Sequence, residues 1–450
     1  MKRSHAIGRA LPSPPMSEGV LFPAPRDPAQ PFWDAAAQTM DPAQRRALQD
    51  ERVRELISRA LSRPVPFFAR KLSAAHREDV RDITGVDDLA GIPVTVKQEL
   101  RDSEQAVPPV GDYRFTELSE CVRMGTSTGT TGIPTTRLWT RHDLWVEYES
   151  AARHWWRNGW RPGMSITHAH PGYLYGGGLL LQGAYEYFGF LAIWVPPPET
   201  DEAAEQGIRT WMRVRPDIPF GHYSVGRFCE VATKLGLDPF DDVGLEQSHY
   251  PGPGADAPLT SGGSECYAFV SSPCRQSPGG HVNEDWAVVE AIDQATGRPV
   301  PDGEWGSLTI TTLERDNPLL RYDLEEAVKL LREPCPCGET TVRALWGGRV
   351  AHLLHAQGHQ FQVADVERAL LTVPEVSTPS LEFVVVRPSD HDAPLVVRVE
   401  RGESTGDANA LRGRCEAAIT TGVGLRAAVD LVERGSLPRS GYKAVRLVEG

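Results

Sequence analysis

The stretch that most constrains the fold lies between residues 158 and 196. A loop, PGYLYGGG, is followed by an apolar helix-like segment and then by FGFLAIWVP, a strand-like segment that ends in prolines. Proline cannot donate to a strand ladder, so it is typical of a strand end. Alternation of helix and strand indicates an α/β fold with a substantially parallel sheet.

Other local patterns predict further elements and a division into domains. Asp41-Pro42 offers an N-cap and a first-turn proline, and apolar residues at helical spacing follow up to Leu61. AVVEAI and SLTITT indicate strands. After Gly348 the order is helix 364–371, strand EFVVVR, strand PLVVRVE, helix 407–419 and strand AAVDLVE, which predicts a small α+β domain. We therefore expect an irregular Pro-rich arm over 1–31, a large α/β domain over 32–347 and a small mobile domain over 348–450.

Composition excludes several classes of protein. The 450 residues are 40% hydrophobic and contain no uninterrupted apolar run near the ~20 residues of a membrane span. A net charge of −13 repels nucleic acid and anionic lipid. The N-terminal MKRSHAIGRALPSPP is too short and too broken for a secretory h-region, so we expect a cytoplasmic protein.

The segment MGTSTGTTGIPTT contains six threonines, one serine and three glycines. Such a composition is typical of a flexible linker, but a glycine-rich loop can also turn backbone N–H groups and hydroxyls toward a polyphosphate. The lysine that a P-loop requires is absent, because Ile133 follows Gly132. A Walker-type NTPase is therefore disfavoured.

The seven cysteines are too few and odd in number for a disulfide framework in a chain of this length. Cys335 and Cys337 flank one proline, and Cys274 and His281 lie among turn residues in SSPCRQSPGGH. Three thiolates and one imidazole form an ordinary structural set for Zn²⁺. We predict a closed zinc site at these four residues, with free thiols in a reducing compartment as the alternative.

Several separated motifs together resemble those of phenylacetate-CoA ligases, a branch of the adenylate-forming enzymes. They are STGTTGIPT, PLLRYDLEEAVKL, CPCG, GGRVAHLLHAQGHQF and the terminal SLPRSGYKAVRLVE, preceded by FWDAAAQTM, PVPFFARKL and GIPVTVKQELRD. The resemblance extends from about Pro31 to the last residue and implies an α/β domain of the adenylate-forming type with a small C-terminal α+β domain.

The resemblance implies a two-step ligase that uses ATP, Mg²⁺ and CoA. A small, aromatic carboxylic acid would attack the α-phosphate of ATP, and the thiol of CoA would then attack the acyl carbon. A carrier protein or an amine as acceptor is left open, and so is a homodimer.

The resemblance also implies roles for individual residues. The phosphate loop comprises Ser127, Thr128, Gly129, Thr130, Thr131 and Gly132. Glu265 matches the acidic residue near Mg²⁺ and the α-phosphate, and Lys443 matches the lysine required for adenylation. Glu326 falls at the ribose-binding position and Arg349 in the hinge region. The loop that lines the aryl pocket corresponds to Tyr173, Tyr175, Gly176 and Gly177.

The sequence departs from the family pattern at three places. Ile133 replaces the phosphate-loop lysine, Leu324-Glu325-Glu326 replaces TGD, and HYPGPGADAPLT stands where the family has a turn and a helix. These departures motivate a second interpretation, a relative that binds nucleotide or an acyl compound with impaired turnover. Retention of Glu265 and Lys443 favours the active enzyme.

Overall fold

The computed structural model describes most of the chain from residue 26 onward. The described ranges are 26–62, 65–127, 134–169, 176–218, 226–245, 266–267, 269–274, 276–377, 380–390, 392–402, 406–437 and 446–449. The contacts within the chain divide it into two compact units. The first unit comprises Met1–Gly163, Gly172–Phe190 and Pro258–Trp346, and the second comprises Met164–Pro171, Leu191–Ala257 and Gly347–Gly450. The expected domain boundary at 347/348 stays a prediction.

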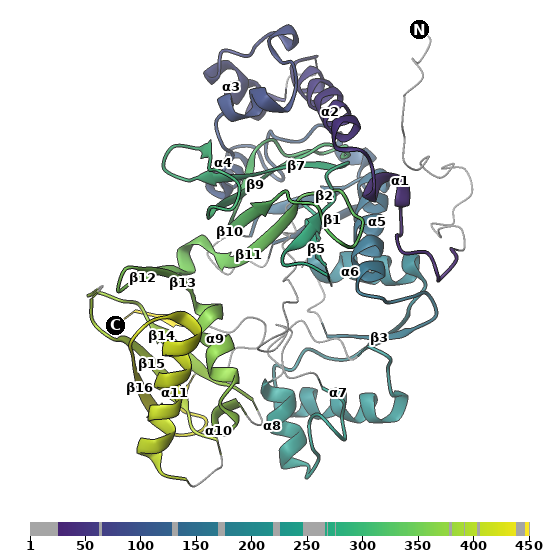
Figure 1. The fold of residues 1–450 in the computed structure, drawn as a ribbon. Helices are drawn as coiled ribbons and strands as arrows, with labels where there is room; N and C mark the ends of the chain where they lie inside the picture. Colours follow the sequence, from purple (N-terminus) through teal and green to yellow (C-terminus); the bar gives the residue numbers. More distant parts are fainter. Residues whose placement is uncertain are drawn as a thin grey trace. The chain divides into compact units, whose positions relative to one another are not determined.

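The first unit carries the N-terminal helices (Figure 1). They are α1 (Ala35–Gln38), α2 (Pro42–Ser62), α3 (Pro66–Ala74), α4 (Lys97–Ala106), α5 (Arg141–Arg157) and α6 (Gly176–Phe188), with the short 3₁₀ turns η1 (Val80–Asp82), η2 (Val86–Gly91) and η3 (Leu118–Glu120). The helix predicted after Asp41 is confirmed as α2. The Asp41 carboxylate accepts hydrogen bonds from the backbone N–H groups of Ala43 and Gln44, at 2.9 and 3.2 Å. These contacts fix the start of the helix.

A seven-stranded sheet is the largest sheet among the described residues, in the order β5-β6-β11-β10-β9-β7-β8. Its strands are β5 (Ser271–Pro273), β6 (Gly280–Val282), β7 (Ala287–Asp293), β8 (Arg298–Pro299), β9 (Gly306–Thr312), β10 (Tyr322–Leu331) and β11 (Arg343–Arg349). The pairs β5–β6, β6–β11, β9–β10, β7–β9 and β7–β8 are antiparallel. The expectation of a substantially parallel sheet is therefore wrong for this layer, whereas the strands predicted from AVVEAI and SLTITT are confirmed as β7 and β9.

Helices α5 and α6 pack on one another through aromatic rings. The Trp155 ring lies 5.1 Å from Tyr185, 5.3 Å from Phe188 and 5.1 Å from Phe190, centroid to centroid. Thr140 and Asp143 cap α5 reciprocally, at 3.1 and 3.2 Å. This packing holds the C-terminal end of α6 against α5.

The second unit contains a parallel strand pair, two helices and a small α+β module. The strand pair is β3 (Ser165–His168) with β4 (Leu191–Trp194), the latter confirming the strand predicted from FGFLAIWVP, and the helices are α7 (Asp201–Val214) and α8 (Gly226–Lys234). The remaining elements are η4 (Val350–His352), β12 (Leu353–Ala356), β13 (His359–Gln362), α9 (Val363–Leu371), α10 (Pro374–Ser377), β14 (Phe383–Val386), β15 (Leu395–Glu400), α11 (Ala408–Val423), β16 (Ala427–Val432) and β17 (Leu447–Val448).

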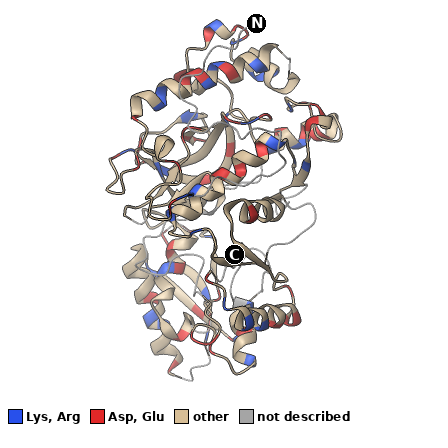
Figure 2. Ribbon diagram, turned by 90° about the vertical axis from the view of Figure 1, so that its right-hand side faces the viewer, with Lys and Arg blue, Asp and Glu red and all other residues tan. Residues whose placement is uncertain are grey.

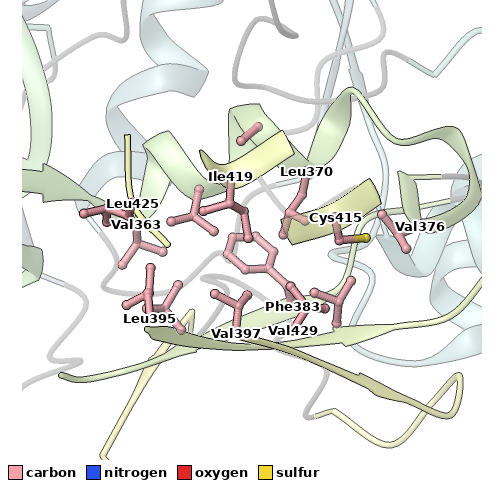
Figure 3. Close-up of a cluster of buried hydrophobic side chains, with 14 of the residues drawn as sticks. Val363, Leu370, Val376, Phe383, Leu395, Val397, Cys415, Ile419, Leu425 and Val429 are labelled. Atoms are coloured by element: carbon pink, nitrogen blue, oxygen red, sulfur yellow. The ribbon is translucent and has the colours of Figure 1, made fainter. Parts of the chain in front are cut away.

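A four-stranded sheet in the order β16-β15-β14-β17 forms the base of the α+β module. The pair β14–β15 is antiparallel, and β15–β16 and β14–β17 are parallel. Figure 3 shows the ring of Phe383 surrounded by aliphatic side chains of the helices and the sheet. The helices and strands predicted for 364–433 are confirmed in order.

Charge is distributed along the surface helices. Figure 2 shows Lys and Arg interspersed with Asp and Glu. Among the described residues, no helix is both long and apolar enough to cross a membrane. All seven cysteines are free thiols.

Candidate active site and metal centre

The phosphate-loop segment is carried by a β-hairpin of the first unit. Strands β1 (Arg123–Thr126) and β2 (Thr136–Trp139) are antiparallel, with Thr126 opposite Thr136. Ser127 N–H donates to the Thr135 carbonyl, and Thr135 N–H donates to Ser127 Oγ, both at 3.0 Å. Ser127 is buried and closes the neck of the loop. The other predicted loop residues, Thr128, Gly129, Thr130, Thr131 and Gly132, lie outside the described residues.

The strand that leads into this loop lies against the start of α6. A Cβ atom added to Gly125 would lie 2.8 Å from Gly176 Cα and 2.9 Å from the Trp139 ring, so only glycine permits this approach. The structure therefore brings one predicted substrate residue, Gly176, beside the hairpin. Gly177 follows it in the helix and is half-buried. Tyr173 and Tyr175 lie outside the described residues.

Glu326, predicted at the ribose position, lies in an irregular part of β10. The register shifts between Asp323, opposite Thr309, and Ala327, opposite Ser307, so β10 bulges there. Glu325 has a φ of +58°. The Asp323 carboxylate accepts hydrogen bonds from Gln294 Nε2 and from Glu325 N–H, both at 2.8 Å, and so stabilises the bulge. Glu326 itself is buried.

Arg321, which precedes Tyr322 in the family-like motif PLLRYDLEEAVKL, makes structural contacts. Arg321 is 1% exposed, and its Nε and Nη2 each lie 2.9 Å from a different oxygen of Glu290. Its guanidinium also donates to the backbone carbonyl groups of Ile92 and Gly297. These contacts join the sheet to the loop before α4 rather than leaving the guanidinium to bind a phosphate.

Of three further predicted residues, the structure describes only Arg349. Arg349 is the last residue of β11 and is half-buried, in the second unit. Glu265 and Lys443 lie outside the described residues. Their neighbours in sequence are described: Cys266 is buried, and Leu437 and Arg446 flank the segment that contains Lys443.

The four predicted metal ligands converge in the first unit. Their ligand atoms, from Cys274, His281, Cys335 and Cys337, all lie within 4.8 Å of one another. Cys274 Sγ is 3.4 Å from Cys335 Sγ, and Cys337 Sγ is 3.2 Å from His281 Nε2. A tetrahedral zinc site has ligand–ligand edges of about 3.5–3.8 Å, calculated from metal bonds of about 2.0–2.3 Å. The donor set is the one that this ion takes, and the two quoted separations are about 0.3–0.4 Å shorter than the matching edges.

Neighbouring residues orient the imidazole toward the sulfur atoms. His281 Nδ1 lies 3.1 Å from the Thr341 carbonyl and 3.4 Å from a Glu339 carboxylate oxygen. Arg157 Nε donates to Glu339 at 2.8 Å. With Nδ1 engaged, Nε2 is the nitrogen that faces the cysteines, which is the arrangement that zinc-binding histidines favour. The sequence analysis missed Glu339 and Arg157.

The backbone holds the ligand-bearing turns close together. Arg343 donates to the carbonyl of Pro278, between Cys274 and His281, at 2.6 Å, and to that of Glu333, before Cys335, at 3.3 Å. One buried side chain of β11 thus links both turns.

Burial shifts the pKa of two of the four ligands. It lowers the pKa of His281 to about 4, so the imidazole is neutral and can donate a lone pair. It raises the pKa of Cys337 to about 12, so a bound cation would have to displace the thiol proton.

Comparisons with known proteins complete the description of the site. The family model of the AMP-binding enzyme C-terminal domain matches residues 363–450. A phenylacetate-coenzyme A ligase of Thermus thermophilus is 32% identical over 456 residues, covering 93% of this chain and 99% of the relative. One of Escherichia coli is 28% identical, covering 90% of this chain and 94% of the relative. A crystal structure of 2-hydroxyisobutyryl-CoA ligase in the postadenylation state, in complex with 2-HIB-AMP, matches with a TM-score of 0.82 and 25% identity, covering 96% of this chain and 95% of that one.

Proposed function

The chain belongs to the phenylacetate-CoA ligase family of adenylate-forming enzymes, and from this premise we propose that its acid substrate is a small aromatic carboxylate. The protein is an acid:CoA ligase that works through an acyl adenylate. The match to the Thermus thermophilus ligase over 99% of that enzyme carries this conclusion. The aromatic class is supported by the names of the relatives and by Tyr173 and Tyr175 in the segment before Gly176.

In the proposed first step, a carboxylate oxygen of the acid attacks the α-phosphorus of ATP, and pyrophosphate leaves. The hydroxyls and backbone N–H groups of the loop from Ser127 to Gly132 would hold the phosphates, and Lys443 would offset the charge that develops at the α-phosphate. Glu265 would hold Mg²⁺ there, and Glu326 would accept hydrogen bonds from the ribose. In the second step the CoA sulfur attacks the acyl carbon, and AMP leaves.

The closed neck of the hairpin supports the proposed role of the phosphate loop. Two mutual hydrogen bonds between Ser127 and Thr135 fix where the loop begins and ends. The contact of Gly125 with Gly176 places the start of α6 against the same hairpin. Fixed ends lower the entropy lost when the proposed donors are ordered, and electrostatic stabilisation is effective when its donors are preorganised.

Lys443 lies in the C-terminal part of the chain and the loop lies in the N-terminal part. The division near Gly348, where Arg349 follows, is therefore proposed as a hinge that lets the small domain deliver Lys443.

For the four-residue cluster we propose a structural Zn²⁺ site. Four protein ligands close the coordination shell, so no position is left for a substrate. The observations that support it are the convergence of the donors within 4.8 Å and the engaged Nδ1 of His281.

The function is tested by measuring pyrophosphate release with ATP, Mg²⁺ and a panel of acids: phenylacetate, benzoate, acetate and 2-hydroxyisobutyrate, with CoA thioester quantified by mass spectrometry. We expect the aryl acids to be the best substrates and CoA to be acylated. Preference for 2-hydroxyisobutyrate would overturn the aromatic class. Nucleotide binding without pyrophosphate release for any acid would favour the impaired relative.

A further inference from the structure

The segment that contains Lys443, residues 438–445, is flanked by two described residues, Leu437 and Arg446. We propose that Glu400 and Arg446 are positioning residues for the adenylation step, because they fix the two ends of this segment to adjacent strands. The inference rests on the role proposed for Lys443.

Glu400 holds the upstream end. It is the last residue of β15 and is fully buried, at 0% exposure. One carboxylate oxygen accepts a hydrogen bond from Leu437 N–H at 2.7 Å, and the other accepts one from Gly435 N–H at 3.0 Å. Arg434 Nε lies 3.8 Å from the second oxygen. Both oxygens are thus directed at the backbone that leads into the Lys443 segment.

Arg446 holds the downstream end. Its Nη1 donates to the Glu382 carboxylate at 2.8 Å and to the Phe383 carbonyl at 3.2 Å, and its Nη2 donates to the Leu381 carbonyl at 3.1 Å. Its guanidinium carbon lies 4.9 Å from the centre of the Phe383 ring. Its own carbonyl accepts a hydrogen bond from Val385 N–H at 2.7 Å, which starts the pairing of β17 with β14.

The carboxylates that hold the two ends of the segment belong to paired residues, Glu400 and Glu382. Glu400 N–H donates to the Glu382 carbonyl at 2.9 Å, so the two residues whose carboxylates hold the segment lie opposite one another, at the end of β15 and just before β14. Both are buried, at 0% and 4% exposure. Burying two negative charges together costs desolvation that buried ion pairs do not always recover in stability. This cost favours a role of the two carboxylates in setting the backbone path at Leu437 and Arg446 over a role in stability.

Position matters because the proposed lysine must meet a transferring phosphoryl group. A misplacement of about 1 Å in a catalytic group can cost on the order of 100-fold in rate. Because Lys443 is three residues from Arg446 and six from Leu437, loosening either end of the segment should displace Lys443. Formation of the acyl adenylate should therefore depend on both anchors.

The test separates the two half-reactions. Glu400→Gln retains one acceptor oxygen but replaces the other with an NH₂ group, which cannot accept from Gly435 or Leu437. Arg446→Lys keeps the charge but loses the planar guanidinium, whose two terminal nitrogens reach the Glu382 carboxylate and the carbonyl groups of Phe383 and Leu381 together. Adenylation is measured as pyrophosphate release from ATP and acid, and thioester formation is measured from CoA and chemically prepared acyl adenylate, which bypasses the proposed role of Lys443.

Matched controls come from the same unit. Glu416→Gln alters a carboxylate that accepts from Val429 N–H at 3.0 Å, and Arg414→Lys alters a partner of Glu375 at 2.6 Å. We expect Glu400→Gln and Arg446→Lys to slow adenylation at least about 10-fold, as the loss of preorganised contacts does, while thioester formation stays within about twofold and both controls resemble the wild type.

Two results would overturn the inference. One is that both anchor variants keep adenylation within about twofold while Lys443→Ala abolishes it; the other is that they lose both half-reactions in equal measure together with thermal stability, which a merely structural role predicts. Normal adenylation by Lys443→Ala would instead overturn the proposed role of Lys443, so the two failures are distinguishable.

Discussion

Removing one ligand of the Cys₃His cluster should destabilise the first unit by an amount that can be worked out. Cys337→Ser removes the sulfur that lies 3.2 Å from His281 Nε2 and leaves three ligands. A metal present at 1,000 times its Kd stabilises the folded state by about 4.1 kcal/mol. At roughly 2 °C per kcal/mol for a unit of this size, loss of the metal lowers Tm by about 8 °C.

The assay combines metal analysis with thermal unfolding of the full chain, before and after treatment with a strong zinc chelator. The wild type should contain about one zinc per chain and lose about 8 °C on chelation, because the four ligands form one site. Cys337→Ser should contain little zinc, start near the lower Tm and respond weakly to chelator. Cys121→Ser, a partly exposed thiol outside the cluster, is the control and should behave as the wild type. Active wild-type protein without metal, with a Tm indifferent to chelator, would refute the site.

Three other outcomes are expected. Lys443→Ala should slow acyl-adenylate formation at least about 100-fold, measured by pyrophosphate release, with near-normal thioester formation from supplied acyl adenylate. Arg153 contacts the buried Asp285 carboxylate at 2.8 and 2.9 Å, so Arg153→Met leaves that charge without its cation and should lower the free energy of unfolding by about 3–5 kcal/mol, measured with denaturant. Arg209→Met removes an exposed ion pair with Glu205 and should lower it by less than about 0.5 kcal/mol. Burial lowers the pKa of His154 to about 3, so folding excludes a proton that the unfolded chain binds below about pH 6.5, and stability falls as pH falls. At pH 5.5 this lowers the free energy of unfolding by about 1.4 kcal/mol relative to pH 7.5. The His154 ring stacks on Phe269 at 4.2 Å, so His154→Phe keeps an aromatic ring there, and its stability should fall by about 1.4 kcal/mol less over the same pH interval.

The parts of the fold that follow from local patterns were predictable. Asp41 as N-cap and the helical spacing of apolar residues up to Leu61 predict α2, which extends from Pro42 to Ser62. The order of the elements after residue 363 follows from the periodicity of apolar residues. The antiparallel arrangement of the large sheet was not predictable, because it joins distant segments: β6 and β11 pair through His281 and Arg343, 62 positions apart (343 − 281). Strand periodicity is the same in parallel and antiparallel pairing, so the sequence pattern could not decide between them.

The metal cluster shows a similar division. Two cysteines around one proline, and a cysteine and histidine among turn residues, have few other chemical uses, so all four candidate ligands could be found in the sequence. Glu339 and Arg157 could not. A carboxylate that supports a histidine has no spacing signature, and Arg157 reaches Glu339 only because the end of α5 lies against the turn after Cys337. The only local signal was the position of Glu339, two residues after Cys337.

The proposed catalytic groups depend on the residues that hold them in place. The sequence motifs name donors and cations, but an attacking carboxylate gains rate only if those groups are held before it arrives. Ser127, Thr135 and Glu400 are buried and Arg446 is half-buried, and their hydrogen bonds hold the ends of the segments that contain the proposed groups. If Lys443 has the proposed role, the absence of a lysine at Ile133 leaves more of the charge compensation to Lys443. The accuracy with which β14 and β15 hold its segment should therefore limit adenylation more strongly in this chain than in a relative that retains the loop lysine.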